Sequence, residues 1–192
     1  MPKTMGSGQA LSMRPEQLDS ILSEASPKMR AVFSTCRFTA CRVSEALQLS
    51  WGNWSGDSLV FPKRLTKGKL KTRTLPVNAR LAEALRQWRT AWTEEYGHEP
   101  SREDYMFPGR AGLQSHFSRK AVDTGLRTIC AKIGIEGAST HSFRRSALTA
   151  ASSSGVTIPV LRTLSGHSSM ACLQKYIDID EDARKKAAMM FA

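Results

Sequence analysis

Residues 58–77 read SLVFPKRLTKGKLKTRTLPV, and this stretch decides the fold class of the chain. Two short β-type runs, at 58–61 and 73–77, flank Gly68, which is available for a turn. We therefore expect a small antiparallel sheet at this point. Apolar residues at helical spacing dominate the rest of the chain, so the sequence predicts an α+β protein that is mainly α-helical.

Helical patterns lie on both sides of this stretch. Upstream, the apolar spacing predicts three helices, over 15–25, from 27 to about 36, and over 43–49. Downstream, Leu81, Leu85, Trp88 and Trp92 share one face of a helix over 79–96. A loop over 97–112 follows, and further helices are expected from about 115 to 133, from 139 or 140 to 155, and over 158–164, 169–176 and 180–190.

The composition narrows the class of protein. The chain has 192 residues, of which 41% are hydrophobic, and this suits one domain with a buried core. Its formal net charge of +11 indicates a polyanionic partner. No apolar run approaches the roughly 18 residues that span a bilayer, so we expect no membrane partner. The four cysteines lack paired spacing, and we interpret them as small buried side chains in a reducing compartment.

The strongest positive charge falls on the predicted hairpin. Residues 58–82 contain no acidic side chain, and their basic residues are Lys63, Arg64, Lys67, Lys69, Lys71, Arg73 and Arg80. Such a patch is the electrostatic signature of phosphate binding. The plainer alternative is a solvated ribbon whose lysines keep a sheet edge from aggregating.

Three further segments carry residues of chemical interest. Arg42 and Glu45 stand three apart at the start of a predicted helix, as do His141 and Arg144 near the start of another. Gly166 and His167 are followed, nine residues after the histidine, by Tyr176. Each pattern alone is as typical of an ion pair or a packing residue as of a catalytic site.

Taken together and in this order, the segments resemble the catalytic domain of tyrosine recombinases, also called phage-type integrases. The resemblance runs from about Leu11 to Ile179. Residues 39–45 (TACRVSE) resemble the first arginine box of the family, 73–76 (RTLP) the end of its lysine-bearing hairpin, and 141–145 (HSFRR) its HxxR box. Residues 164–169 (LSGHSS) and Tyr176 complete the series with the usual spacing. Ala40 and Ser165 depart from the pattern, since the family usually has glycine and a hydrophobic residue there.

The resemblance implies roles for these side chains. Arg42 and Arg144 would clamp the phosphate, because their planar forks suit its oxygens and its more charged transition state. His141 would accept or share a proton, and His167 would donate a hydrogen bond to the phosphate. Glu45 would orient Arg42 or brace the helix.

Strand cleavage also needs a nucleophile and an acid for the departing sugar oxygen. Tyr176 is the expected nucleophile, and the resemblance implies a 3′-phosphotyrosyl intermediate. Lys67 is the expected general acid, and Lys69 is the alternative because the hairpin turn is about one residue longer than usual. The residues expected to bind DNA are Lys63, Arg64, Lys69, Lys71, Arg73 and Arg145. We expect no metal and no cofactor, since the chain has neither a GxxxxGK[ST] loop nor a cluster of carboxylates.

Family behaviour also implies an organisation and a setting. We expect a leader over 1–12, a catalytic domain over 13–179, and a C-terminal helix over 180–192 that is exchanged with a neighbouring protomer or covers its own core. Double-stranded DNA would be the partner, with a tetrameric synapse during recombination. The expected location is the cytoplasm of a bacterial, archaeal or phage-infected cell.

Two other functions fit the same residues. A type IB-like DNA topoisomerase would use the same phosphotyrosyl chemistry, and the active-site residues do not separate it from a recombinase. A non-catalytic module would use the basic hairpin only to grip phosphates.

Overall fold

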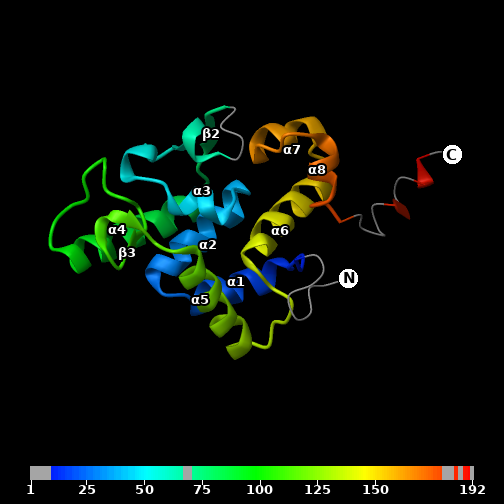
Figure 1. The fold of residues 1–192 in the computed structure, drawn as a ribbon. Helices are drawn as coiled ribbons and strands as arrows, with labels where there is room; N and C mark the ends of the chain where they lie inside the picture. The colour runs from blue at the N-terminus through cyan, green and yellow to red at the C-terminus, as the bar shows by residue number, and fades with distance from the viewer. Residues whose placement is uncertain (1–9, 67–70, 179–183, 186–187, 191–192) are drawn as a thin grey trace.

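The computed structural model describes residues 10–66, 71–178, 184–185 and 188–190 (Figure 1). Its helices are α1 (Pro15–Glu24), α2 (Pro27–Thr39), α3 (Val43–Leu47), α4 (Ala79–Tyr96), α5 (Arg119–Lys132), α6 (Thr140–Ser153), α7 (Ile158–Ser165) and α8 (Met170–Gln174), with 3-10 turns η1 (Trp51–Asn53) and η2 (Lys63–Leu65). Its strands are β1 (Ser58–Phe61), β2 (Arg73–Pro76), β3 (Pro108–Gly109) and β4 (Gly112–His116). The mainly helical α+β prediction is confirmed.

The predicted sheet is present. Strands β1 and β2 pair antiparallel, with Ser58 opposite Pro76 and Phe61 opposite Arg73. Burial alternates along both strands, because one face packs on the core and the other meets solvent. The turn expected at Gly68 and both candidate lysines, Lys67 and Lys69, lie outside the described residues.

A second two-stranded sheet was not predicted. Strands β3 and β4 pair antiparallel, and β4 covers residues that the helical pattern had assigned to the start of the next helix. Gly112, at φ +97°, allows the tight reversal between the strands. Helix α5 therefore begins only at Arg119, where Ser118 caps it by accepting a hydrogen bond from the backbone N–H of Ala121.

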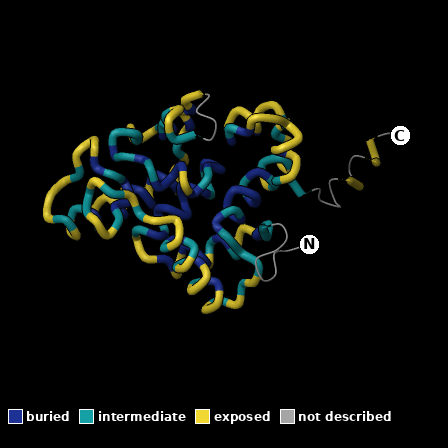
Figure 2. Tube along the Cα trace, in the orientation of Figure 1, coloured by how far each residue is buried: buried dark blue, intermediate teal, exposed yellow. Residues whose placement is uncertain are grey.

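The buried side chains form two clusters joined by α6. The larger cluster collects residues from α1 to α5 and both strands β1 and β2, and the smaller one comprises Ala40, Leu148, Leu161 and Leu173. Helix α6 serves both: Phe143 stacks on Phe33 of α2 at a centroid distance of 4.8 Å, whereas Leu148 faces α7 and α8. Figure 2 shows that the buried residues follow the middle of the molecule and that exposed ones cover the outer turns.

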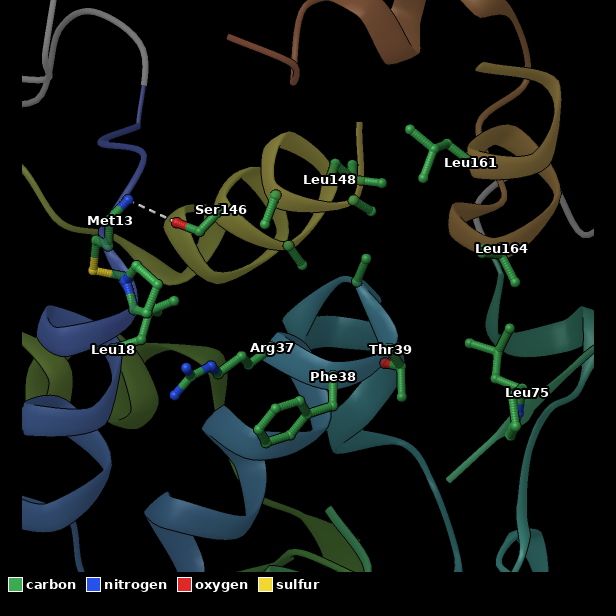
Figure 3. A pocket seen from close by; sticks show the side chains of 16 residues that line it. Met13, Leu18, Arg37, Phe38, Thr39, Leu75, Ser146, Leu148, Leu161 and Leu164 are labelled. Carbon is green, nitrogen blue, oxygen red and sulfur yellow. Dashed lines mark hydrogen bonds between the residues drawn. The ribbon is translucent and has the colours of Figure 1, made fainter. Parts of the chain in front are cut away.

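The seam between the clusters contains an apolar cavity of about 390 Å³. Figure 3 shows Leu148 of α6, Leu161 of α7 and Leu75 of β2 around it, with Met13 at the far end. The backbone N–H of Met13 donates to Ser146 Oγ (2.7 Å) and so ties the segment before α1 to α6.

Two further expectations need correction. Cys172 is exposed on α8, whereas Cys36, Cys41 and Cys130 are buried as predicted. Helix α8 ends at Gln174, so Tyr176 lies just beyond the helix and not within it. Much of the predicted C-terminal helix falls outside the described residues.

Candidate active site

Three of the predicted residues converge where α6 meets the turn after α7 and the residues after α8. The guanidinium of Arg144 lies against the ring of His167, and its central carbon is 5.5 Å from the centroid of the Tyr176 ring. The rings of His167 and Tyr176 are 5.0 Å apart, centroid to centroid. Residues separated by more than thirty positions in the sequence thus form one cluster.

Arg42 joins this cluster from the start of α3. It occupies the N-cap position, where Glu45 on the first turn accepts hydrogen bonds from its backbone N–H (3.1 Å) and from its Nη1 (2.9 Å). The predicted pairing of these two residues is confirmed. The positive charge of Arg42 acts on both Arg144 and His167, since it lowers the pKa of each.

Arg144 is almost completely buried, with 1% of its surface exposed. Its Nη1 donates to the carbonyl of Ala40 (2.6 Å) and its Nη2 to that of Ser165 (3.0 Å). No carboxylate among the described residues pairs with it, and its Nε has no hydrogen-bond partner there. Burial, and then the charge of Arg42, lowers the pKa of Arg144 to about 10. The hydrogen bonds of this buried cation thus go only to neutral groups, while the carboxylate of Glu45 acts on its charge without bonding to it.

Ala40 takes an unusual backbone conformation for this contact. It follows α2 at φ 50° and ψ 25°, in the left-handed region that glycine favours. This is the position where the sequence has alanine in place of the usual glycine of the resembled family. The chain reverses there, and the Ala40 carbonyl accepts from the guanidinium of Arg144.

His167 is held in one tautomer by its neighbours. Ser165 Oγ donates its proton to the carbonyl of Leu161 (2.7 Å), so it can only accept from His167 Nδ1 (2.7 Å). Arg144 Nη2 lies 2.9 Å from His167 Nε2 and 3.1 Å from Nδ1, and with the proton on Nδ1 it is Nε2 that accepts. Burial, followed by the charges of Arg144, Arg42 and Arg73, lowers the pKa of His167 to about 3, so the imidazole is neutral at pH 7.

Tyr176 is placed by a set of contacts to α6. Its carbonyl accepts from Thr149 Oγ1 (3.3 Å), and the same Oγ1 accepts from the backbone N–H of Asp178 (3.2 Å). Arg145 forms an ion pair with Asp178. The half-buried ring of Tyr176 packs on the smaller core cluster. These contacts fasten the residues around the tyrosine to the helix that carries Arg144.

His141 lies on the first turn of α6, three residues before Arg144, and is half-buried. Its proton-sharing role stays a prediction. Lys63, Arg64 and Lys71 are exposed, as expected for residues that contact DNA.

Arg73 and Arg145, also expected to bind DNA, are each only 8% exposed. Arg145 is occupied by Asp178, and Arg73 Nη2 pairs with Glu45 (2.7 Å) while its Nη1 donates to the carbonyl of Leu164 (2.9 Å). Both arginines brace the site from inside and do not offer their charge to the surface.

The sequence pattern missed the contributions of Arg73 and Ser165. Arg73 alternates with Leu75 on β2, and this period-two spacing is a signal that its side chain shares the buried face. No comparable signal marks Ser165, whose role depends on the turn that brings it beside His167. Within the described residues, no three His, Cys, Asp or Glu side chains gather as they would around a metal ion. None of the helices described there is long and apolar enough to cross a membrane.

Arg144, His167 and Tyr176 thus lie together on a mainly helical domain, and Arg42 lies close enough for its charge to act on Arg144 and His167. The chain belongs to the phage integrase family, whose family model matches residues 12–183. It is 24% identical over 181 residues to the tyrosine recombinase XerD of Chlamydia pneumoniae, an alignment that covers 89% of this chain and 58% of that protein. The chain thus spans little more than half the length of this relative.

Solved structures share the fold. The XerA recombinase matches with a TM-score of 0.76 and 17% identity, over 96% of this chain and 65% of that one. The XerH site-specific recombinase bound to its difH substrate matches with a TM-score of 0.70 and 21% identity, over 98% of this chain and 56% of that one. The Tn1549 transposon integrase in complex with a circular intermediate DNA matches with a TM-score of 0.75 and 14% identity, over 97% and 67%.

Proposed function

We propose that this chain is the catalytic part of a site-specific DNA recombinase that cleaves and rejoins strands through Tyr176. The observation that supports it best is Arg144, a buried guanidinium without a carboxylate. Burying an uncompensated charge costs free energy unless an anion arrives to balance it. The phosphate group of DNA is such an anion. In the cleavage reaction it passes through a pentacoordinate transition state that carries more negative charge than the ground state. Arg144 would thus bind the transition state more strongly than the substrate.

The proposed chemistry uses Tyr176, His141 and one lysine of the hairpin. The Tyr176 oxygen attacks the phosphorus, its proton passes to His141, and the bond from phosphorus to the 5′ oxygen breaks. Lys67, or Lys69 as the alternative, protonates that oxygen, which leaves as a 5′ hydroxyl. The product is a 3′-phosphotyrosyl bond, and attack by a 5′ hydroxyl of another strand reverses every step. The phosphodiester bond energy is kept, so the rejoining step consumes no nucleotide.

His167 requires a change of partner in this scheme. In the free protein its Nε2 accepts from Arg144. When Arg144 turns its N–H groups toward a phosphate, Nε2 loses that donor, and a shift of the ring proton from Nδ1 to Nε2 would let His167 donate to the phosphate. Ser165 Oγ can follow, because a hydroxyl both donates and accepts.

The partners belong to the same proposal. XerH and the Tn1549 integrase were solved in complexes with DNA, and their folds match this chain. We propose double-stranded DNA as the substrate and a tetrameric synapse as the working assembly. Met189 and Met190 are 81% and 83% exposed, which suits a C-terminal segment that docks on a neighbouring copy. We also propose the cytoplasm of a bacterial, archaeal or phage-infected cell as its location.

A suicide substrate tests the proposal. In a duplex nicked near the scissile phosphate, cleavage frees a short fragment that carries the 5′ hydroxyl. This fragment diffuses away, so rejoining fails and the covalent protein–DNA adduct accumulates. With randomised flanking sequence, the DNA in the adduct can then be sequenced. We expect adducts with the wild-type chain and with Tyr105→Phe, a control tyrosine outside the site, and none with Tyr176→Phe. DNA binding without any adduct would favour the non-catalytic module. Relaxation of supercoiled DNA without strand exchange between two duplexes would favour a topoisomerase.

A further inference from the structure

A groove of about 640 Å³ runs between the predicted hairpin and α7 and ends at the candidate active site. Thr66 and residues 71–75 line it on the hairpin side, and on the other side it is lined by Pro159, Arg162, Thr163, Leu164, Gly166, His167 and Ser168. The groove is thus continuous with the place where a scissile phosphate would lie.

The geometry of α7 directs one face into this groove. Pro159, Arg162, Thr163 and Gly166 have the spacing i, i+3, i+4 and i+7, which places them on a single side of the helix. Leu161 and Ser165, on the opposite side, are buried. The helix therefore packs its apolar face on the smaller core cluster and leaves Arg162 to line the groove.

The width of the groove is fixed by Arg73. Its Nη1 donates to the Leu164 carbonyl (2.9 Å), and this bond links β2 to α7. The same guanidinium pairs with the buried Glu45. Because both walls are held before any ligand arrives, binding there loses little conformational entropy.

The charge of the groove is positive and unbalanced. None of its lining residues is acidic. The side chains of Lys71 and Arg162 are exposed, and neither forms an ion pair or a hydrogen bond within the described part of the chain. Some exposed arginines elsewhere are paired with a carboxylate, as Arg86 is with Glu83 and Arg119 with Asp123.

Hydroxyl groups complete the lining. Thr72 and Ser168 are exposed at the groove, one on each side. Cations and hydroxyls without carboxylates are the set that proteins direct at phosphate and sugar oxygens of nucleic acid.

We propose that this groove binds the DNA backbone next to the scissile phosphate, with Arg162 of α7 and Lys71 of the hairpin as the cations that hold it. The inference rests on the proposed function for the identity of the polyanion and adds a binding residue, Arg162, that no sequence motif marked. The two cations approach the strand from opposite walls, so they fix its path toward Arg144 and Tyr176.

The test is the salt dependence of binding to a mixed-sequence duplex, measured with the full chain by fluorescence anisotropy. The slope of log K against log salt is negative, and each phosphate contact that is lost reduces its magnitude by about 0.9. We expect Arg162→Ala to weaken binding several-fold and to reduce the slope by about one, and Lys71→Ala combined with Arg162→Ala to reduce it by about two. Arg127→Ala is the matched control, because Arg127 is an exposed arginine on α5 without an ion pair in the described residues.

The outcomes separate this inference from the proposed function. The proposal that the groove binds DNA would be contradicted if the slope for Arg162→Ala equals that for Arg127→Ala. It would also be contradicted if Arg162→Ala weakens binding and leaves the slope unchanged. The adduct assay judges the function by itself, since Tyr176→Phe removes the nucleophile and leaves the groove intact. If the wild-type chain forms adducts and Arg162→Ala leaves the salt slope unchanged, the proposed function is supported and the proposed DNA-binding role of the groove is wrong.

Discussion

Arg144 is the residue whose environment is hardest to explain without a ligand. A buried arginine ordinarily has a carboxylate, because the desolvation of its charge is otherwise not repaid. Here two backbone carbonyls and a histidine bond to it, Arg42 adds a second positive charge nearby, and Glu45 acts on it only at a distance because its carboxylate is bonded to Arg42 and Arg73. Burial of this charge destabilises the free protein, and the interaction becomes favourable once a phosphate binds.

Replacement of Arg144 by methionine tests this view. We expect Arg144→Met to lower the rate of adduct formation by at least about 10²-fold, as the loss of one preorganised donor does in other enzymes. Stability should change by less than about 2 kcal/mol, because losing the hydrogen bonds to two buried carbonyls is offset by removing an unpaired buried charge. Urea denaturation gives the stability, and the nicked duplex gives the rate. Normal adduct formation by this variant would remove Arg144 from the mechanism.

His167 predicts a pH dependence of stability. Its pKa is about 3 in the folded chain, against an ordinary value of 6.5. Between these two values the unfolded chain binds a proton that the folded chain does not, so unfolding becomes easier as the pH falls from about 6.5 toward 3, and stability is level above that range. The free energy of unfolding, measured by urea denaturation across this range, should fall less steeply for His167→Gln than for the wild type. His98→Gln, at an exposed histidine, should behave as the wild type; equal slopes for all three proteins would show that His167 is not held neutral.

At the scale of elements, Arg73 connects three segments that the site needs in register. It lies at the start of β2, pairs with Glu45 on α3, and donates to the end of α7 at Leu164. Its guanidinium also stacks over Phe61 of β1, 5.1 Å from the ring centroid. One planar fork thus fixes the hairpin, the helix of Arg42 and the turn of His167 to one another.

Arg73→Lys keeps the charge and removes the fork. We expect it to lower stability by about 1.5–3 kcal/mol, because a lysine in this position cannot bond the carboxylate and the carbonyl together, and hydrogen bonds to charged groups contribute about that much. Arg80→Lys, at an exposed ion pair with Asp19, should change stability by less than about 1 kcal/mol. The free energy of unfolding of both variants, measured by urea denaturation, shows whether the contacts of Arg73 stabilise the fold. Similar losses for the two would contradict the bracing role.

The elements also show where sequence patterns are informative. The helix over 79–96 has a strong apolar stripe, and its predicted bounds match α4. Strand β3 has two residues, too few to establish any period, so the second sheet was missed. Arg73 was expected to bind DNA because of its charge. Its alternation with Leu75 along β2 indicated instead that its side chain shares the buried face of the strand. The bond between Arg144 and Ala40 joins residues about a hundred positions apart, and nothing in the sequence predicted it. The family resemblance predicted only that Arg144 and Arg42 act on the same phosphate.

At the scale of the whole molecule, the site lies where the two core clusters meet. Arg42 and Glu45 belong to the side of the larger cluster, whereas Leu161 before His167 and the ring of Tyr176 belong to the smaller one. Figure 1 shows α6, α7 and α8 gathered on one side of the helices from the first half of the chain. Because the clusters join through α6 and one partly filled seam, small shifts between them would change the distance between nucleophile and clamp.

The most direct test of the central claim identifies the atom that joins protein to DNA. The adduct trapped on the nicked duplex is digested with nuclease and trypsin, and the peptides are analysed by mass spectrometry. Our account predicts a nucleotide joined through its 3′ phosphate to peptide 176–184, on Tyr176. A nucleotide on a peptide that contains Tyr96 or Tyr105, or a link through a 5′ phosphate, would contradict it.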